Sequence, residues 1–511
     1  MLIKVLSASN SGLETIGVDV EVNVANRGLP AFEIVGLPNK AVDESKERVK
    51  TAISNSEIQF PARRIIVNLA PADVPKEGSC YDLPIAVGIL ALTMGYKLPA
   101  DSLFFGELSL DGTLRHTKGT LLVSLFAKEK RIKNIFVPRV SANEAAIVKE
   151  VNVYAIENLN ELLAYFSGQI ELKPLRYTEG RCDQTFNQSE FDMADILGQE
   201  QAKRAMEISA SGGHNLFMIG NPGSGKTMLA RALPGILPLL TEEESLEVTK
   251  IYSASGRIPP EGFLIKKRSF RSPHHTISQI GLIGGGTKPQ PGEVSLAHRG
   301  VLFLDEFNEF PRSVMEVLRQ PIEDGCVTIS RSHSRVNYPC RFMLIASSNP
   351  CPCGYLHHPK KQCICTQREI EKYRRRVSGP ILDRIDIHIR VPAVDIRELS
   401  GNQQAIRVLE SSLKIRMRVI KAREIQAERF AKEKIHANAE MRNKHIKKYC
   451  YLSKEVGQML MQAGLSFQLS ARSYFKIIKI ARTIADLDGL SEITLSHMAE
   501  ALQYRPRIQT E

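Results

Sequence analysis

Short runs in which apolar and polar residues alternate characterise the chain up to about residue 172. The run Gly17-Val-Asp-Val-Glu-Val-Asn-Val24 has the two-residue period of a strand with one buried face, and Ile65-Ile-Val-Asn-Leu69 forms another apolar run. Between such runs, residues 41–55 have a helical spacing. The pattern predicts a compact α/β or α+β domain over residues 1–172.

The pattern changes twice more along the chain. Residues 173–190 are polar without a sustained period, which is typical of a linker. Residues 191–395 alternate between helix and strand patterns, as expected of a parallel sheet covered by helices. Residues 396–511 are nearly all helical, from the charged stretch 402–434 to the apolar periodic stretch 474–487. A chain of 511 residues is long enough for about three domains, so we predict an α/β protein with a C-terminal helical domain.

A glycine-rich segment, Gly220-Asn-Pro-Gly-Ser-Gly-Lys-Thr227, lies between an apolar run and a helix-forming stretch. At the spacing G-x-x-x-x-G-K-T, consecutive backbone N–H groups wrap a β-phosphate, the lysine reaches the β- and γ-oxygens, and the threonine hydroxyl binds Mg²⁺. The following helix directs its positive end at the anion. The segment is therefore predicted to bind ATP and Mg²⁺ through Gly220, Asn221, Pro222, Gly223, Ser224, Gly225, Lys226 and Thr227.

A second chemical motif is the apolar run Gly300-Val-Leu-Phe-Leu-Asp-Glu306. A strand that is apolar throughout is buried on both faces of a parallel sheet, and its acidic end emerges at the edge where phosphate ligands bind. We predict that Asp305 holds Mg²⁺ and that Glu306 polarises the attacking water.

The order of these two motifs resembles that of the AAA+ ATPases. The resemblance implies that Asn349 is the polar sensor between nucleotide and water, that Arg384 is the arginine finger reaching a neighbouring subunit's γ-phosphate, and that Arg472 is a second sensor in the helical lid. Taken singly, these residues have ordinary alternatives, because Asn349 could cap a turn and each arginine could pair with a surface carboxylate.

The chain has nine cysteines, and four of them crowd into one short segment. An odd number with such a cluster suits a reducing cytoplasm and a metal site better than a disulfide framework. The cluster, two C-x-C pairs, is predicted to bind one structural Zn²⁺. Reduced thiols without a metal, or His357 or His358 in place of one cysteine, are the alternatives. The predicted ligands are Cys351, Cys353, Cys363 and Cys365.

The net charge of +12 is unevenly distributed. Residues 1–175 carry 19 Lys and Arg against 20 Asp and Glu, which leaves 49 against 36 for residues 176–511. Clustered positive charge is typical of a polyanion partner, with a solvated surface as the alternative. A hairpin over residues 327–337 is predicted to contact DNA through Arg331, His333 and Arg335, unless it is an ordinary solvated hairpin. The most apolar run, residues 83–94, is shorter than the roughly 20 residues of a membrane span.

Several longer segments resemble the ComM/YifB family, often labelled magnesium-chelatase-like, over essentially the whole chain. The resemblance implies a hexameric ring that couples ATP hydrolysis to DNA branch migration in homologous recombination and natural transformation. Residues 241–299 resemble the helix-2 insertion of magnesium chelatases and MCM-type helicases. The segments that carry the family resemblance are NRGLPAFEIVGLP (26–38), VNLAPAD (67–73), GEVSLAHRG (292–300) and NPCPCG (349–354).

Two other functions are weighed against this one. The N-terminal domain resembles that of Lon proteases, which use a Ser–Lys dyad, but Cys80 takes the place of the serine and Leu121 that of the lysine. With no basic residue at the position of the lysine, the thiol is expected to stay mostly protonated, although His116 and Lys118 lie nearby in sequence. The second alternative is a magnesium chelatase motor, whose ATPase subunits generally lack the Lon-like domain and the cysteine cluster.

Overall fold

The computed structural model describes residues 2–25, 29–37, 40–72, 76, 78–177, 190–258, 264–286, 289–330, 335–393, 409–433 and 435–505. The chain forms two compact units. Unit 1 comprises Met1–Cys182, Glu243–Ile265 and Thr328–Tyr338, and unit 2 comprises Asp183–Glu242, Lys266–Val327 and Pro339–Glu511.

Unit 1 is built on a mixed seven-stranded sheet in the order β3-β4-β2-β1-β5-β8-β9. The strands are β1 (Leu2–Ser11), β2 (Glu14–Val24), β3 (Ala31–Val35), β4 (Arg64–Ala70), β5 (Ser102–Phe104), β8 (Asn134–Pro138) and β9 (Asn152–Ile156), with a small ribbon of β6 (Glu107–Leu108) and β7 (Leu114–Arg115). The helices are α1 (Lys40–Asp43), α2 (Ser45–Asn55), α3 (Asp82–Met94), α4 (Thr120–Glu129), α5 (Arg139–Ala145), α6 (Leu159–Phe166) and α9 (Glu242–Ser255).

The apolar pattern of the N-terminal residues corresponds to the strands and helices of unit 1. In β2 the valines at alternate positions from Val18 to Val24 are buried, as expected of a strand with one face on the core. The apolar run that is too short for a membrane is the buried helix α3, which packs on β1 and β2. Its glycine, Gly88, approaches β2 so closely that a Cβ atom would lie 2.5 Å from Val22.

Unit 2 contains a five-stranded parallel sheet in the order β11-β14-β17-β10-β18. These strands are β11 (Phe270–Arg271), β14 (Val301–Leu304), β17 (Met343–Ser348), β10 (Leu216–Gly220) and β18 (Ile387–Val391). Because β11 is an edge strand of this sheet, part of the stretch 241–299 belongs to the ATPase core and not to an insertion. The helices before the C-terminal region are α7 (Glu200–Gly212), α8 (Lys226–Ile236), α10 (Gln279–Ile283), α11 (Glu293–Leu296), α12 (Arg312–Val317), α13 (Arg319–Asp324), α14 (Gln367–Arg374) and α15 (Gly379–Leu382).

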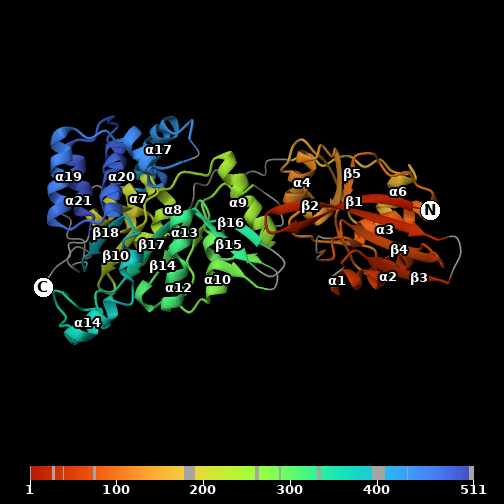
Figure 1. Cartoon of the computed structure of the whole chain (residues 1–511), viewed down its shortest axis with the longest axis horizontal. Coiled ribbons are helices and arrows are strands. Elements are labelled where there is room, and N and C mark those ends of the chain that lie inside the picture. The colour runs from red at the N-terminus through yellow and green to blue at the C-terminus, as the bar shows by residue number, and fades with distance from the viewer. Residues whose placement is uncertain are drawn as a thin grey trace. The chain divides into compact units, whose positions relative to one another are not determined.

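The C-terminal region is helical, as predicted, and appears in blue in Figure 1. Helix α7 packs against two of these helices, and apolar residues from the sheet and from the C-terminal helices form one core. The described part of this region therefore belongs to the same compact unit as the sheet. Its helices are α17 (Ser412–Arg429), α18 (Asn443–Tyr449), α19 (Lys454–Ser466), α20 (Ala471–Leu487) and α21 (Leu495–Gln503).

The predicted hairpin is present as β15 (Cys326–Ser330) paired with β16 (Arg335–Pro339). Val336 packs against the turn at Gly12, where a Cβ atom would lie 2.1 Å from its side chain. Arg335 is exposed, whereas Arg331 and His333 lie outside the described residues. Most of the predicted linker, residues 178–189, also lies outside them. Within the described ranges, no helix combines the length and apolar character needed to cross a bilayer.

Candidate functional site

The order of the parallel strands brings the predicted ATP-site residues together. Strand β17 lies between β10 and β14 and is parallel to both, so the three carboxyl ends meet at one edge of the sheet. The phosphate loop, residues 220–227, follows β10, while Asp305 and Glu306 follow β14 and Asn349 follows β17. This is the edge at which open α/β sheets bind ligands.

The phosphate loop has the conformation that its glycines permit. Gly223 and Gly225 have φ angles of 74° and 86°, in the left-handed region that other residues resist, and nothing lies within 4 Å of where their Cβ atoms would be. The buried hydroxyl of Ser224 has no hydrogen-bond partner in the described structure. Free space, a polar group without a partner and the N-terminus of the eleven-residue helix α8 fit a nucleotide phosphate.

Two hydroxyls surround the carboxylate that is predicted to hold Mg²⁺. Thr227 Oγ1 donates to Asp305 Oδ2 at 2.8 Å, and Ser347 Oγ donates to Asp305 Oδ1. Hydroxyl and carboxylate oxygens from a phosphate loop and a neighbouring strand are the hard donors that Mg²⁺ uses beside a nucleotide. Residues Thr227 and Asp305 therefore fit the ion, and Ser347 is a neighbour that sequence reasoning did not single out.

Lys226 is 8% exposed and connects the phosphate loop to Asn349 at the end of β17. Its Nζ donates to the carbonyls of Gly220 at 2.7 Å and Asn221 at 2.9 Å and lies 3.4 Å from Asn349 Oδ1. Burial lowers the pKa of Lys226, and the carboxylates of Asp305 and Glu306 oppose that effect. The side chains of Lys226 and Asn349, which were predicted from separate motifs, therefore lie in contact.

Glu306 has a φ angle of 50°, which directs the backbone away from the strand after Asp305. Its side chain is 55% exposed, and Oε2 lies 3.8 Å from Nδ1 of His275. Sequence reasoning missed His275. The signal was the stretch Ser272-Pro-His-His275 directly after β11, the edge strand next to β14.

The two predicted arginines of the ATPase cycle bind the same carboxylate. Glu323 of α13 accepts from Arg384 Nη2 at 2.8 Å and from Arg472 Nη2 at 2.9 Å. Arg384 also donates to the carbonyl of Pro380 at 2.7 Å, and its side chain is 12% exposed, against 56% for Arg472. The shared carboxylate places both arginines at one position on the surface of unit 2.

The four clustered cysteines converge in space. Their Sγ atoms all lie within 4.8 Å of one another, and neither His357 nor His358 belongs to this group. His358 Nδ1 instead accepts from the backbone N–H groups of Lys360 and Lys361. This arrangement favours the four-thiolate set over a set containing histidine, and Zn²⁺ binding stays a prediction. The members of the cluster are Cys351, Cys353, Cys363 and Cys365.

Cys80 and Leu121 are the residues predicted to stand where Lon proteases have their serine and lysine. Leu121 is fully buried in α4, and its backbone N–H donates to Glu144 Oε1 at 2.9 Å. Cys80 is 8% exposed and belongs to the core of unit 1. Leu121 has no basic group to activate a thiol, which weighs against the Ser–Lys type of dyad.

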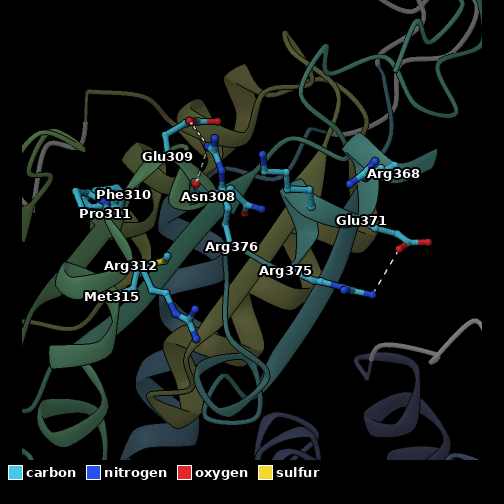
Figure 2. Close-up of a pocket in the computed structure, with 11 residues that line it drawn as sticks. Asn308, Glu309, Phe310, Pro311, Arg312, Met315, Arg368, Glu371, Arg375 and Arg376 are labelled. Carbon is cyan, nitrogen blue, oxygen red and sulfur yellow. Dashed lines mark hydrogen bonds and ion pairs between the residues drawn. The ribbon is translucent and has the colours of Figure 1, made fainter. Parts of the chain in front are cut away.

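A basic pocket of about 720 Å³ is lined by residues on and around α12 and α14 (Figure 2). Two of its arginines are paired, Arg376 with Glu309 at 2.7 Å and Arg375 with Glu371 at 3.5 Å. Its other cations, for which the described residues provide no ion pair, are Arg312, Arg368 and Lys372.

Three family models match successive parts of the chain. Residues 20–141 match "Subunit ChlI of Mg-chelatase", residues 192–399 match "Magnesium chelatase, subunit ChlI", and residues 409–505 match "Magnesium chelatase, subunit ChlI C-terminal". The central match includes the phosphate loop, Asp305, Glu306 and the cysteine cluster. The chain therefore has a magnesium-chelatase-like AAA+ domain.

Comparison with curated proteins extends the similarity to nearly the full length. The chain is 41% identical to the competence protein ComM of Haemophilus influenzae, over 99% of this chain and 97% of that protein. It is 41% identical to YifB of Salmonella typhimurium over 97% of this chain and 95% of that protein. It is 26% identical to the magnesium-chelatase 38 kDa subunit of Cereibacter sphaeroides over 31% of this chain and 53% of that protein. The chain therefore belongs to the ComM/YifB family.

Proposed function

We propose that this chain is the subunit of an ATP-driven hexameric ring that acts on DNA and moves branched junctions during recombination. The observation that carries the proposal is the ATP site, where Lys226 lies 3.4 Å from Asn349 and Thr227 donates to Asp305. The chain that holds this site is similar over nearly its full length to a competence protein. Competence is the uptake of DNA, so DNA is the partner that this similarity favours.

Each residue of the ATP site has its own role in the proposed hydrolysis of ATP. Lys226 and the backbone N–H groups of the phosphate loop bind and orient the phosphates. Mg²⁺, held by Thr227 and Asp305, would neutralise charge that develops on the β- and γ-oxygens. Glu306 aligns the attacking water with the γ-phosphorus and, as the general base, takes up its proton while the bond from the γ-phosphorus to the ADP oxygen breaks. Asn349 holds the water from the other side.

The arginines support the proposal of a ring. Arg384 and Arg472 share Glu323 as a partner, so both can be supplied together to a second site. A neighbouring subunit's γ-phosphate is a stronger acceptor than one carboxylate, because several phosphate oxygens are available to two guanidinium groups. We infer that the ion pairs with Glu323 position the two arginines until the neighbouring subunit binds ATP.

Positive charge supports a nucleic-acid partner. Residues 176–511 carry a net charge of about +13, and the pocket in Figure 2 adds a local concentration of cations. Contacts of lysine and arginine with phosphates give affinity without base specificity, which suits a motor that moves along DNA.

A magnesium chelatase motor is the second candidate, favoured by the three family models alone. The similarity to the 38 kDa chelatase subunit covers 31% of the chain, whereas the similarity to ComM covers 99%. Measuring ATP hydrolysis with and without branched DNA separates the two candidates, because a chelatase motor has no reason to respond. Unchanged hydrolysis at saturating DNA would overturn the proposed DNA function.

The hairpin prediction has its own test. We expect the double variant Arg331→Ala, Arg335→Ala to lose DNA-stimulated ATP hydrolysis while it keeps the basal rate. Each lost phosphate contact should reduce the slope of log affinity against log salt by about one. The control variant, Lys97→Ala with Lys149→Ala, removes two exposed cations from the N-terminal domain and should behave as the wild type. If the arginine variant retains full stimulation and branch migration, the hairpin does not grip DNA.

A further inference from the structure

The cysteine cluster has the dimensions of a tetrahedral zinc site. Sγ of Cys351 lies 3.4 Å from that of Cys353 and 3.7 Å from that of Cys363, and the last two are 3.5 Å apart. A disulfide needs about 2.05 Å between its sulfurs. Four thiolates around Zn²⁺, with Zn–S bonds of about 2.3 Å, stand about 3.8 Å apart. The observed separations fit the metal and exclude a disulfide.

Backbone donors are directed at two of these sulfurs. The N–H group of Leu356 lies 3.3 Å from Cys351 Sγ, and that of Cys353 lies 3.4 Å from Cys365 Sγ. Hydrogen bonds of this kind orient metal-bound thiolates and offset their negative charge. With a metal bound, these two N–H groups would donate to thiolate ligands.

The turn at residues 351–356, which carries the first two cysteines and is called the cysteine turn below, contacts the phosphate loop. Asn221 Nδ2 donates to the carbonyl of Gly354 at 2.7 Å and lies 3.3 Å from the carbonyl of Leu356. Gly354 has a φ angle of 81°, and a Cβ atom there would lie 2.5 Å from the ring of Pro222. Asn221 is 7% exposed, so these bonds are sheltered from water. The cysteine turn therefore packs against residues 221 and 222 of the phosphate loop.

The turn is also tied to the cluster and to the sensor. Gly354 N donates to the carbonyl of Cys351 at 3.0 Å, and Cys351 follows Asn349 by two residues. A bound metal would fix Cys351 and Cys353 and, through them, the carbonyls that Asn221 binds. Loss of the metal would free the turn and remove the support of the phosphate loop.

We propose that Cys351, Cys353, Cys363 and Cys365 bind one Zn²⁺ and that this zinc site holds the phosphate loop, through Asn221, in the conformation that binds ATP. The inference rests on the ATP site of the proposed function but not on DNA as the partner. It makes ATP affinity dependent on zinc occupancy.

The first measurement is the zinc content of the full-length protein purified without chelator. We expect about one zinc per chain by elemental analysis and well under half of that for Cys363→Ser. The matched control is Cys326→Ser, because Cys326 is half-buried like Cys363 but lies outside the cluster. A wild-type content near zero would overturn the metal site.

The second measurement is the affinity for a non-hydrolysable ATP analogue. We expect Cys363→Ser and zinc-depleted wild type to bind it about tenfold more weakly, as for the loss of one or two hydrogen bonds, with recovery of the depleted protein when Zn²⁺ is returned. Asn221→Ala should keep its zinc and weaken binding similarly, and combining it with Cys363→Ser should add little further loss, because both act through one contact.

The outcomes separate the two proposals. Zinc bound at full occupancy with unchanged nucleotide affinity after its removal, or fully additive effects of the two substitutions, would overturn the coupling and leave the proposed ATPase intact. Failure of the zinc-loaded wild type to bind the analogue at all would overturn the proposed function itself. Depletion and return of zinc are carried out on the wild-type chain. The coupling can therefore be tested even if a cysteine variant does not fold.

Discussion

Replacing Glu306 by glutamine should lower ATP turnover by about 10²–10⁴-fold, the range expected for a lost general base. We propose that this carboxylate acts on the attacking water and not on the phosphates, whose binding is assigned to Lys226 and the phosphate loop. ATP binding should therefore survive, and the variant should retain ATP that it cannot cleave. Steady-state phosphate release and binding of a labelled nucleotide measure the two effects.

Two further variants are compared with Glu306→Gln, one expected to lose nucleotide binding and one that serves as a control. Lys226→Ala should lose nucleotide binding itself, because the loop then has no cation for the β- and γ-oxygens. Glu309→Gln is the matched control, since Glu309 is a nearby carboxylate paired with Arg376. Wild-type turnover by the Glu306 variant would remove this residue from the mechanism.

Replacing Arg384 by alanine should lower turnover by about 10³–10⁵-fold, the effect expected for loss of an arginine finger. Because the arginine is proposed to act on the next subunit, the loss should be repaired in mixed rings. Subunits that carry Lys226→Ala bind no ATP but still offer Arg384, and subunits that carry Arg384→Ala still bind ATP. A mixture of two inactive variants should therefore hydrolyse ATP measurably.

Arg390→Ala provides the control, because Arg390 is an exposed arginine in the adjacent strand β18. It should leave turnover unchanged. Arg472→Ala should be rescued in mixed rings in the same way, as the shared partner Glu323 implies. Absence of activity in every mixture, with rings shown to have exchanged subunits, would refute action between subunits.

Several features of the site were predictable because each is contained in a short stretch of chain. The phosphate loop is formed by consecutive backbone groups, so its glycines and Lys226 reveal it in the sequence alone. The buried strand that ends at Asp305 is recognisable for the same reason, since both of its faces are apolar. The helical C-terminal region was likewise visible from the period of its apolar residues.

Other features depend on which strands become neighbours. His275 reaches Glu306 because β11 pairs with β14, and Ser347 reaches Asp305 because β17 lies beside β14. No local pattern specifies these pairings. Strand order follows from how the helices bury the two faces of the sheet, which is a property of the whole domain.

By itself the sequence determined the chemistry: a phosphate loop, an acidic strand end, a group of four thiols and a family resemblance that the full-length similarity confirmed. Only the tertiary structure decided how these parts are connected. Asn221 contacts the cysteine turn more than a hundred residues away, and Arg384 and Arg472 converge on Glu323. The physical reason is that a motif formed by consecutive residues is fixed by local backbone geometry. A contact between distant side chains exists only after hydrophobic burial has set the packing of the elements that carry them.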